Sequence, residues 1–204
     1  MIGLLRSAWN LPSAVPPPPR RVWRDWALVA LVAACAILEG LIRSADLSRP
    51  LLSVVILLAV TPAFLWRRTK PLLMLVIVFV AMAPIEVFVP DSILYTGVSV
   101  IVLPYALFRW GSGRELVIGS CVILGSLGLS FVRSGGLDDL IGGFALLLSV
   151  AILGMAFRYR ASSRQRQLER ITVLEREGLA RDLHDTVAHH VSAIAIRAQA
   201  GLAM

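Results

Sequence analysis

The chain has 204 residues, of which 57% are hydrophobic and 16% charged, and its formal net charge at pH 7 is +7. Its mean hydropathy of +0.78 is too high for an ordinary soluble domain. The arginines cluster between apolar runs instead of forming one basic face, which argues against direct nucleic-acid binding and is typical of the inner ends of membrane helices. We therefore expect an all-α integral membrane protein whose first partner is the lipid bilayer.

Residues 1–25 are expected to form an irregular, cytoplasmic leader rich in proline and arginine. The run Pro16–Pro19 bars a helix and favours an extended polyproline conformation. The apolar pair at residues 4–5 is too short for the core of a secretory signal, so we expect the leader to stay uncleaved. Trp23 and Trp26 are expected at the membrane interface.

Residues 26–157 contain six apolar runs, each near the length that crosses about 30 Å of hydrocarbon as a helix. The expected transmembrane spans are Trp26–Ile42, Leu51–Trp66, Leu72–Phe88, Ile93–Phe108, Leu116–Val132 and Leu140–Phe157. Three of them contain a proline, Pro62, Pro84 or Pro104, which either kinks the helix or ends it.

Loop charges predict the orientation of these spans. Basic residues are concentrated in the segments expected inside, namely Arg6, Arg20, Arg21, Arg24, Arg67, Arg68, Lys70, Arg109 and Arg114; the segments expected outside carry Arg43, Arg49 and Arg133. The positive-inside bias places both termini in the cytoplasm, as an even number of crossings requires. We expect a multi-pass protein of the plasma membrane.

Few ionisable or reactive side chains fall inside the expected spans. Glu39 and Glu86 lie near the predicted outer ends, where an acid is either a functional group at membrane depth or simply reaches the interface. Cys35 and Cys121 are far from the outer loops, so we expect packing residues and no disulfide or metal site.

After residue 157 the composition becomes polar and arginine-rich. Residues 158–178 are expected to form a cytoplasmic linker helix, with the loose apolar stripe of a short coiled coil. Gly178 costs such a helix about 1 kcal/mol relative to alanine. It is either a hinge before the next segment or a tolerated exposed glycine.

The stretch Ala-Arg-Asp-Leu-His-Asp-Thr-Val-Ala-His-His-Val-Ser, residues 180–192, holds every histidine of the chain. Its flanking and internal apolar residues step by three or four, which predicts one apolar stripe on an α-helix. On that helix Asp185 and His189 lie one turn apart on one face, and His184 adjoins Asp185. A second imidazole at His190 points about 100° away from His189, so the histidine pair is a poor metal site.

This stretch resembles the phosphoacceptor box of bacterial two-component sensor histidine kinases, specifically their subgroup 3 dimerisation and phosphoacceptor domain. The resemblance covers roughly residues 165–200. It implies that His184 accepts the γ-phosphoryl group of ATP, that Asp185 is the general base, and that His189 positions water for dephosphorylating the partner. The implied partners are a second copy of the chain, forming a homodimer, and a response regulator with a helix-turn-helix output domain. ATP and Mg²⁺ would bind to a separate ATP-binding domain.

The family builds a four-helix bundle from two helices of each subunit, and residues 179–204 are expected to supply the beginning of that domain. The second helix and the ATP-binding domain are expected to be absent from these 204 residues, so the chain alone is expected to be inactive as a kinase. The alternative function is a non-catalytic polytopic membrane protein, such as a transporter component or a scaffold. Against a transporter, no internal repeat or mid-membrane polar cluster is evident in the sequence.

Overall fold

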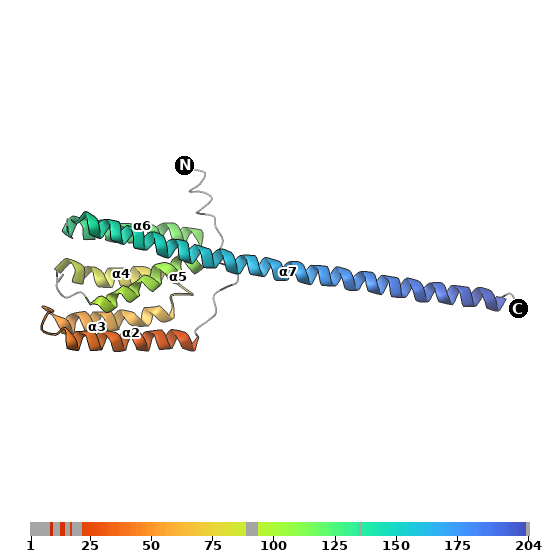
Figure 1. The fold of residues 1–204 in the computed structure, drawn as a ribbon, viewed down its shortest axis with the longest axis horizontal. Helices are drawn as coiled ribbons and strands as arrows, with labels where there is room; N and C mark the ends of the chain where they lie inside the picture. Colours follow the sequence, from red (N-terminus) through yellow and green to blue (C-terminus); the bar gives the residue numbers. More distant parts are fainter. Residues whose placement is uncertain are drawn as a thin grey trace. The chain divides into compact units, whose positions relative to one another are not determined.

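The computed structural model describes residues 9, 13–14, 17, 22–88, 94–134 and 136–202, and within them every regular element is helical. The elements are α2 (Trp23–Ile42), α3 (Pro50–Val60), the 3₁₀ helix η1 (Thr61–Leu65), α4 (Pro71–Phe88), the 3₁₀ helix η3 (Tyr95–Ile101), α5 (Val102–Trp110), α6 (Gly113–Ser134) and α7 (Leu137–Leu202) (Figure 1). The chain divides into two compact units, Met1–Ala161 and Ser162–Met204. The all-α expectation is therefore confirmed for the described residues.

Each of the six apolar runs coincides with helical structure, but the helices differ in length. By length and composition, three are able to cross a membrane: Trp23–Ile42, Gly113–Val132 and the apolar part of Leu137–Leu183. Two more are shorter apolar helices, Pro50–Leu65 and Pro71–Pro84. The run expected as Ile93–Phe108 is divided between η3 and α5. Three long apolar helices are consistent with a membrane protein.

The prolines in these runs mark changes of helix type or helix starts more often than kinks. Pro62 follows directly on the end of α3 and lies in η1, where the chain tightens from α to 3₁₀ geometry. Pro104 lies in the first turn of α5, where a missing N–H leaves no helical hydrogen bond unmade. Pro84 alone lies inside a helix, α4.

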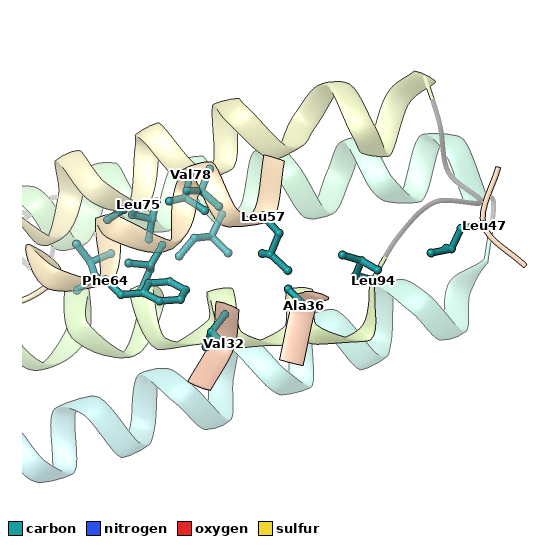
Figure 2. Close-up of a cluster of buried hydrophobic side chains, with 13 residues drawn as sticks. Val32, Ala36, Leu47, Leu57, Phe64, Leu75, Val78 and Leu94 are labelled. Carbon is teal, nitrogen blue, oxygen red and sulfur yellow. The ribbon is translucent and has the colours of Figure 1, made fainter. Parts of the chain in front are cut away.

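The core of the first unit is formed by side chains of α2, α3, η1 and α4, together with residues of α5 and α6. Phe64, Leu75 and Val78 are fully buried, and Figure 2 shows Val32 and Ala36 of α2 in the same cluster of side chains. At Gly40 an added Cβ would clash with Val54, so α2 and α3 approach closely there. Such close packing is how helices associate where lipid supplies no hydrophobic driving force.

A buried carboxylate ties the start of α2 to the segment between η1 and α4. Asp25 is only 1% exposed, and its Oδ1 atom accepts hydrogen bonds from Arg67 at 2.7 Å and Arg68 at 2.9 Å. Burial lowers the pKa of the Arg67 guanidinium, whereas the Asp25 charge acts to raise it. Arginine remains charged nonetheless, so the single Asp25 carboxylate balances one of the two neighbouring positive charges.

The first part of α7 packs directly on α5. An added Cβ at Gly154 would lie 2.8 Å from the Cβ of Phe108 and 3.2 Å from the carbonyl oxygen of Tyr105. One turn further along, the ring of Phe157 meets Tyr105 edge-on at 6.4 Å. The buried Arg158 then donates a hydrogen bond of 2.7 Å to the carbonyl oxygen of Gly111. These contacts fix α7 against the end of α5.

We predict that Gly154→Leu separates α7 from α5 and destabilises the first unit by about 1 to 3 kcal/mol, the usual cost of overpacking. Thermal unfolding of the purified protein in detergent measures this. The matched control is Gly142→Leu on the same helix, because an added Cβ at Gly142 meets nothing within 4 Å. Equal unfolding temperatures for the two variants would contradict the proposed close contact.

Candidate functional site

The residues singled out by the sequence, His184, Asp185 and His189, all lie on the α-helical backbone of α7. The prediction of a helix through this segment is confirmed as far as Leu202. Helical register puts positions 185 and 189 one turn apart on one face, with position 184 adjacent. Their side chains fall outside the described part of the chain, so the roles assigned to them stay predictions.

The apolar stripe that precedes this box is exposed in the single chain. Leu168, Ile171, Leu174, Leu179 and Leu183 of α7 are each between 51% and 66% exposed. An apolar stripe at helical spacing normally faces a partner helix. The described part of the second unit therefore leaves a face that a second helix would cover, as the sequence predicted.

Two pairs of polar side chains in this part of α7 interact with each other along the helix. Gln165 donates a hydrogen bond to Glu169, and Arg181 forms an exposed ion pair of 3.8 Å with Glu177, each four residues apart. Such pairs stabilise an isolated helix by about 0.2 to 0.5 kcal/mol. Gly178 lies between Glu177 and Arg181, in open space and within unbroken helix, which favours a tolerated glycine over a hinge.

Residues 175–204 match the family model described as histidine kinase. The resemblance is confirmed over this stretch. The match contains the Leu-His-Asp sequence at residues 183–185 and continues along the same helix, α7, to residue 204. Comparisons with curated proteins and with solved structures give no significant match. Members of this family generally dimerise and act on response regulators, so the match favours the kinase interpretation over a transporter component or scaffold.

No group of three or more His, Cys, Asp or Glu side chains able to hold a metal occurs among the described residues. Cys35 and Cys121 are free. What the box itself contributes is an imidazole and a neighbouring carboxylate on one helix.

The acid at Glu39, considered from the sequence as a candidate at membrane depth, has a structural role. Its carboxylate accepts hydrogen bonds from the backbone N–H of Tyr95 at 2.6 Å, and from the backbone N–H and the hydroxyl of Thr96 at 2.8 and 2.6 Å. It also pairs with Arg43 at 2.8 Å, whose guanidinium lies over the Tyr95 ring. Glu39 thus fastens the start of η3 to the end of α2. The side chain of Glu86 lies outside the described residues.

Sequence reasoning missed the partners of these charged groups. Asp25 is the first acidic residue of the chain, directly after Arg24, and its position in the first turn of a helix was the available signal. Nothing in the local pattern pointed to Arg67 and Arg68 as its partners. Arg158 was expected only as the first residue of the cytoplasmic linker, and its hydrogen bond to Gly111 was not predicted.

We predict that Glu39→Ala lowers the free energy of unfolding of the first unit by about 2 kcal/mol, because a hydrogen bond to a charged group contributes about 1.5 to 3 kcal/mol. Glu39→Gln keeps one carbonyl oxygen as an acceptor, so it should lower the stability by less than Glu39→Ala does. Unfolding temperature in detergent is the measurement, with Asp46→Ala as the control because Asp46 is a nearby exposed acid. If Glu39→Ala unfolds at the temperature of the control, the fastening role is wrong.

Proposed function

We propose that this chain carries the membrane sensor region and the phosphoacceptor helix of a two-component histidine kinase. The observation that carries the proposal is the family match over residues 175–204, which includes the Leu-His-Asp box on the described helix α7. The kinase works as a homodimer, receives the γ-phosphoryl group of ATP on His184 and passes it to an aspartate of a response regulator with a helix-turn-helix output domain.

The residue chemistry supports this assignment. A histidine near its unperturbed pKa of about 6.5 keeps a free nitrogen lone pair at cytoplasmic pH. Asp185 accepts the proton from the other ring nitrogen of His184, which makes the imidazole a better nucleophile and stabilises the cation formed on attack. The new P–N bond replaces the bond between the γ-phosphorus and the β–γ bridging oxygen, and ADP leaves. His189 positions the water that hydrolyses the acyl phosphate on the regulator's aspartate, which releases inorganic phosphate and restores the carboxylate.

The proposed topology has six crossings of the plasma membrane, with both termini in the cytoplasm. Two sets of contacts support this topology, one between segments expected on the inner side of the membrane and one between segments expected on the outer side. Asp25 with Arg67 and Arg68, and Arg158 with Gly111, join segments expected on the inner side. Glu39 with Tyr95 and Thr96 joins segments expected on the outer side. The exposed tryptophans Trp23 and Trp26 suit the inner interface.

The stripe of exposed leucines on α7 supports the homodimer. A lone helix with this stripe has no partner for it among the described residues of its own unit. Two copies that pair along it bury the stripe, as coiled coils do. The same pairing brings two phosphoacceptor helices into one bundle.

We predict that His184→Gln abolishes labelling by the γ-phosphate of ATP. The assay uses the chain fused to the second helix and ATP-binding domain of a subgroup 3 histidine kinase, reconstituted in lipid vesicles, and it measures acid-labile, base-stable phosphate. The matched control is His190→Gln, which removes a neighbouring imidazole off the proposed catalytic face and should label like the unchanged protein. His189→Gln should also label, and should change only dephosphorylation of the regulator. Labelling of His184→Gln at the level of the His190→Gln control would overturn the assignment.

A further inference from the structure

A partly open cavity of about 240 Å³ lies in the first unit, between α4, η3, α5, α6 and the first part of α7. Its lining includes Gly97, Pro104, Leu127, Gly143 and Leu147. Two serines, Ser126 and Ser130, are the polar side chains among the described residues around it, and no charged side chain lines it. The cavity belongs to neither the phosphoacceptor box nor the ion pairs at the ends of the helices.

The chemistry of the lining specifies an apolar occupant. The Ser126 hydroxyl donates to the carbonyl oxygen of Ile123 in its own helix, at 2.8 Å, so that its proton is already used. An occupant therefore gains little from a polar group and would have to desolvate a charge without compensation. Protein interiors rarely leave spaces much larger than a water molecule unfilled, and apolar cavities take up small apolar molecules.

The volume of the cavity limits the size of the apolar molecule that it can hold. An engineered apolar cavity of about 150 Å³ takes up benzene, whereas sites for drug-sized ligands measure about 300 to 1,000 Å³. A volume of about 240 Å³ suits one substituted ring. A lipid acyl chain covers about 15 Å, half of the hydrocarbon core, so only part of such a chain would fit into a cavity of this volume. The cavity lies between α6 and α7, two of the helices apolar and long enough to span a membrane, so that its occupant would arrive from the hydrocarbon phase.

We propose that this cavity is a binding site for a free, membrane-dissolved apolar molecule of the size of a single substituted aromatic ring, and that its occupancy biases the kinase. Gly143 and Leu147 of α7 line the cavity, and Gly154 of the same helix packs on α5 two turns further along. A molecule between α7 and its neighbours alters that packing, and α7 continues as one helix to His184. A ligand shifts such an equilibrium only by its difference in affinity between the two states.

Binding is independent of the kinase assignment, whereas the regulatory part rests on the proposed function. The test of binding therefore uses the 204-residue chain in phosphatidylcholine–phosphatidylglycerol vesicles and a small apolar photolabel, 3-trifluoromethyl-3-phenyldiazirine. Mass spectrometry locates the labelled residues, and toluene is the competitor. We expect labelling of cavity residues such as Leu147 to be saturable by toluene, and labelling of lipid-facing residues not to be.

Gly97→Leu fills the cavity, because an added Cβ at Gly97 meets nothing within 4 Å and Gly97 is part of the lining. It should lose the saturable labelling. Gly125→Leu is the matched control: an added Cβ there is equally unobstructed, but Gly125 does not line the cavity, so its labelling should persist. Ser126→Met is a second filling variant in case Gly97→Leu does not fold, as judged by its helical circular dichroism.

Three outcomes would overturn the binding site: unsaturable labelling at the cavity, saturable labelling that survives both filling variants, or preferential labelling of Leu147 by a phospholipid with a diazirine in its acyl chain. The regulatory part is tested with the kinase fusion in the same vesicles. We expect toluene to change its autophosphorylation, and Gly97→Leu to remove that response. Saturable labelling without any effect of toluene on phosphorylation would overturn regulation alone. A fusion that incorporates no phosphate either with or without toluene, while labelling stays saturable, would count against the kinase function instead.

Discussion

The structure of the first unit depends on an apolar solvent, such as the hydrocarbon of a membrane, around its outward-facing apolar side chains. Leu31, Leu38 and Leu41 of α2 are each more than half exposed, and the helices α6 and α7 carry similar residues outward. A soluble protein rarely exposes contiguous apolar patches of this extent. In hydrocarbon the same surface costs nothing, while the helical backbone satisfies its own hydrogen bonds. The buried Asp25 is paired with Arg67 near the start of α2, and the buried Arg158 donates a hydrogen bond to the carbonyl oxygen of Gly111.

Helix α7 links the features that the proposed function requires. It lines the apolar cavity through Gly143 and Leu147, contacts α5 through Gly154, and carries His184 on the same helical backbone. In a helix a rotation or shift imposed at one turn is carried to the next by the hydrogen-bond ladder. In the proposed kinase, α7 therefore offers a direct route from the apolar cavity to His184. The proposed regulation needs only two packings of α7 that differ in their affinity for the occupant.

Much of the helical organisation could be predicted from periodicity and composition. The six apolar runs all coincide with helices, and the stripe through Leu168 and Leu183 is exposed on one continuous helix, as expected. The phosphoacceptor box was recognised from thirteen consecutive residues because its chemistry is local: an imidazole, a carboxylate and a second imidazole at helical spacing. The length of each helix was harder to predict from the sequence, because the type of helix at Pro62 and Pro104 depends on the packing around them.

The tertiary pairings could not be predicted in this way. Asp25 pairs with arginines 42 and 43 residues away, and Glu39 binds the backbone 56 and 57 residues away. Periodicity describes one helix at a time and does not state which ends meet. The cavity likewise arises from five elements, each with an ordinary apolar face, and its lining includes Gly97 and Gly143. Its existence depends on how closely those elements approach.

The position of the phosphoacceptor helix on the cytoplasmic side is tested most directly by cysteine accessibility in intact cells. The variants carry Ser192→Cys or Ser44→Cys in a background in which Cys35 and Cys121 are replaced by alanine, and the probe is a membrane-impermeant maleimide. The proposed topology predicts that the cysteine at 44, in the turn after α2, reacts in intact spheroplasts, and that the cysteine at 192 reacts only after permeabilisation. Reaction at 192 in intact spheroplasts would place the box away from ATP and the regulator, and would contradict a histidine kinase of this topology.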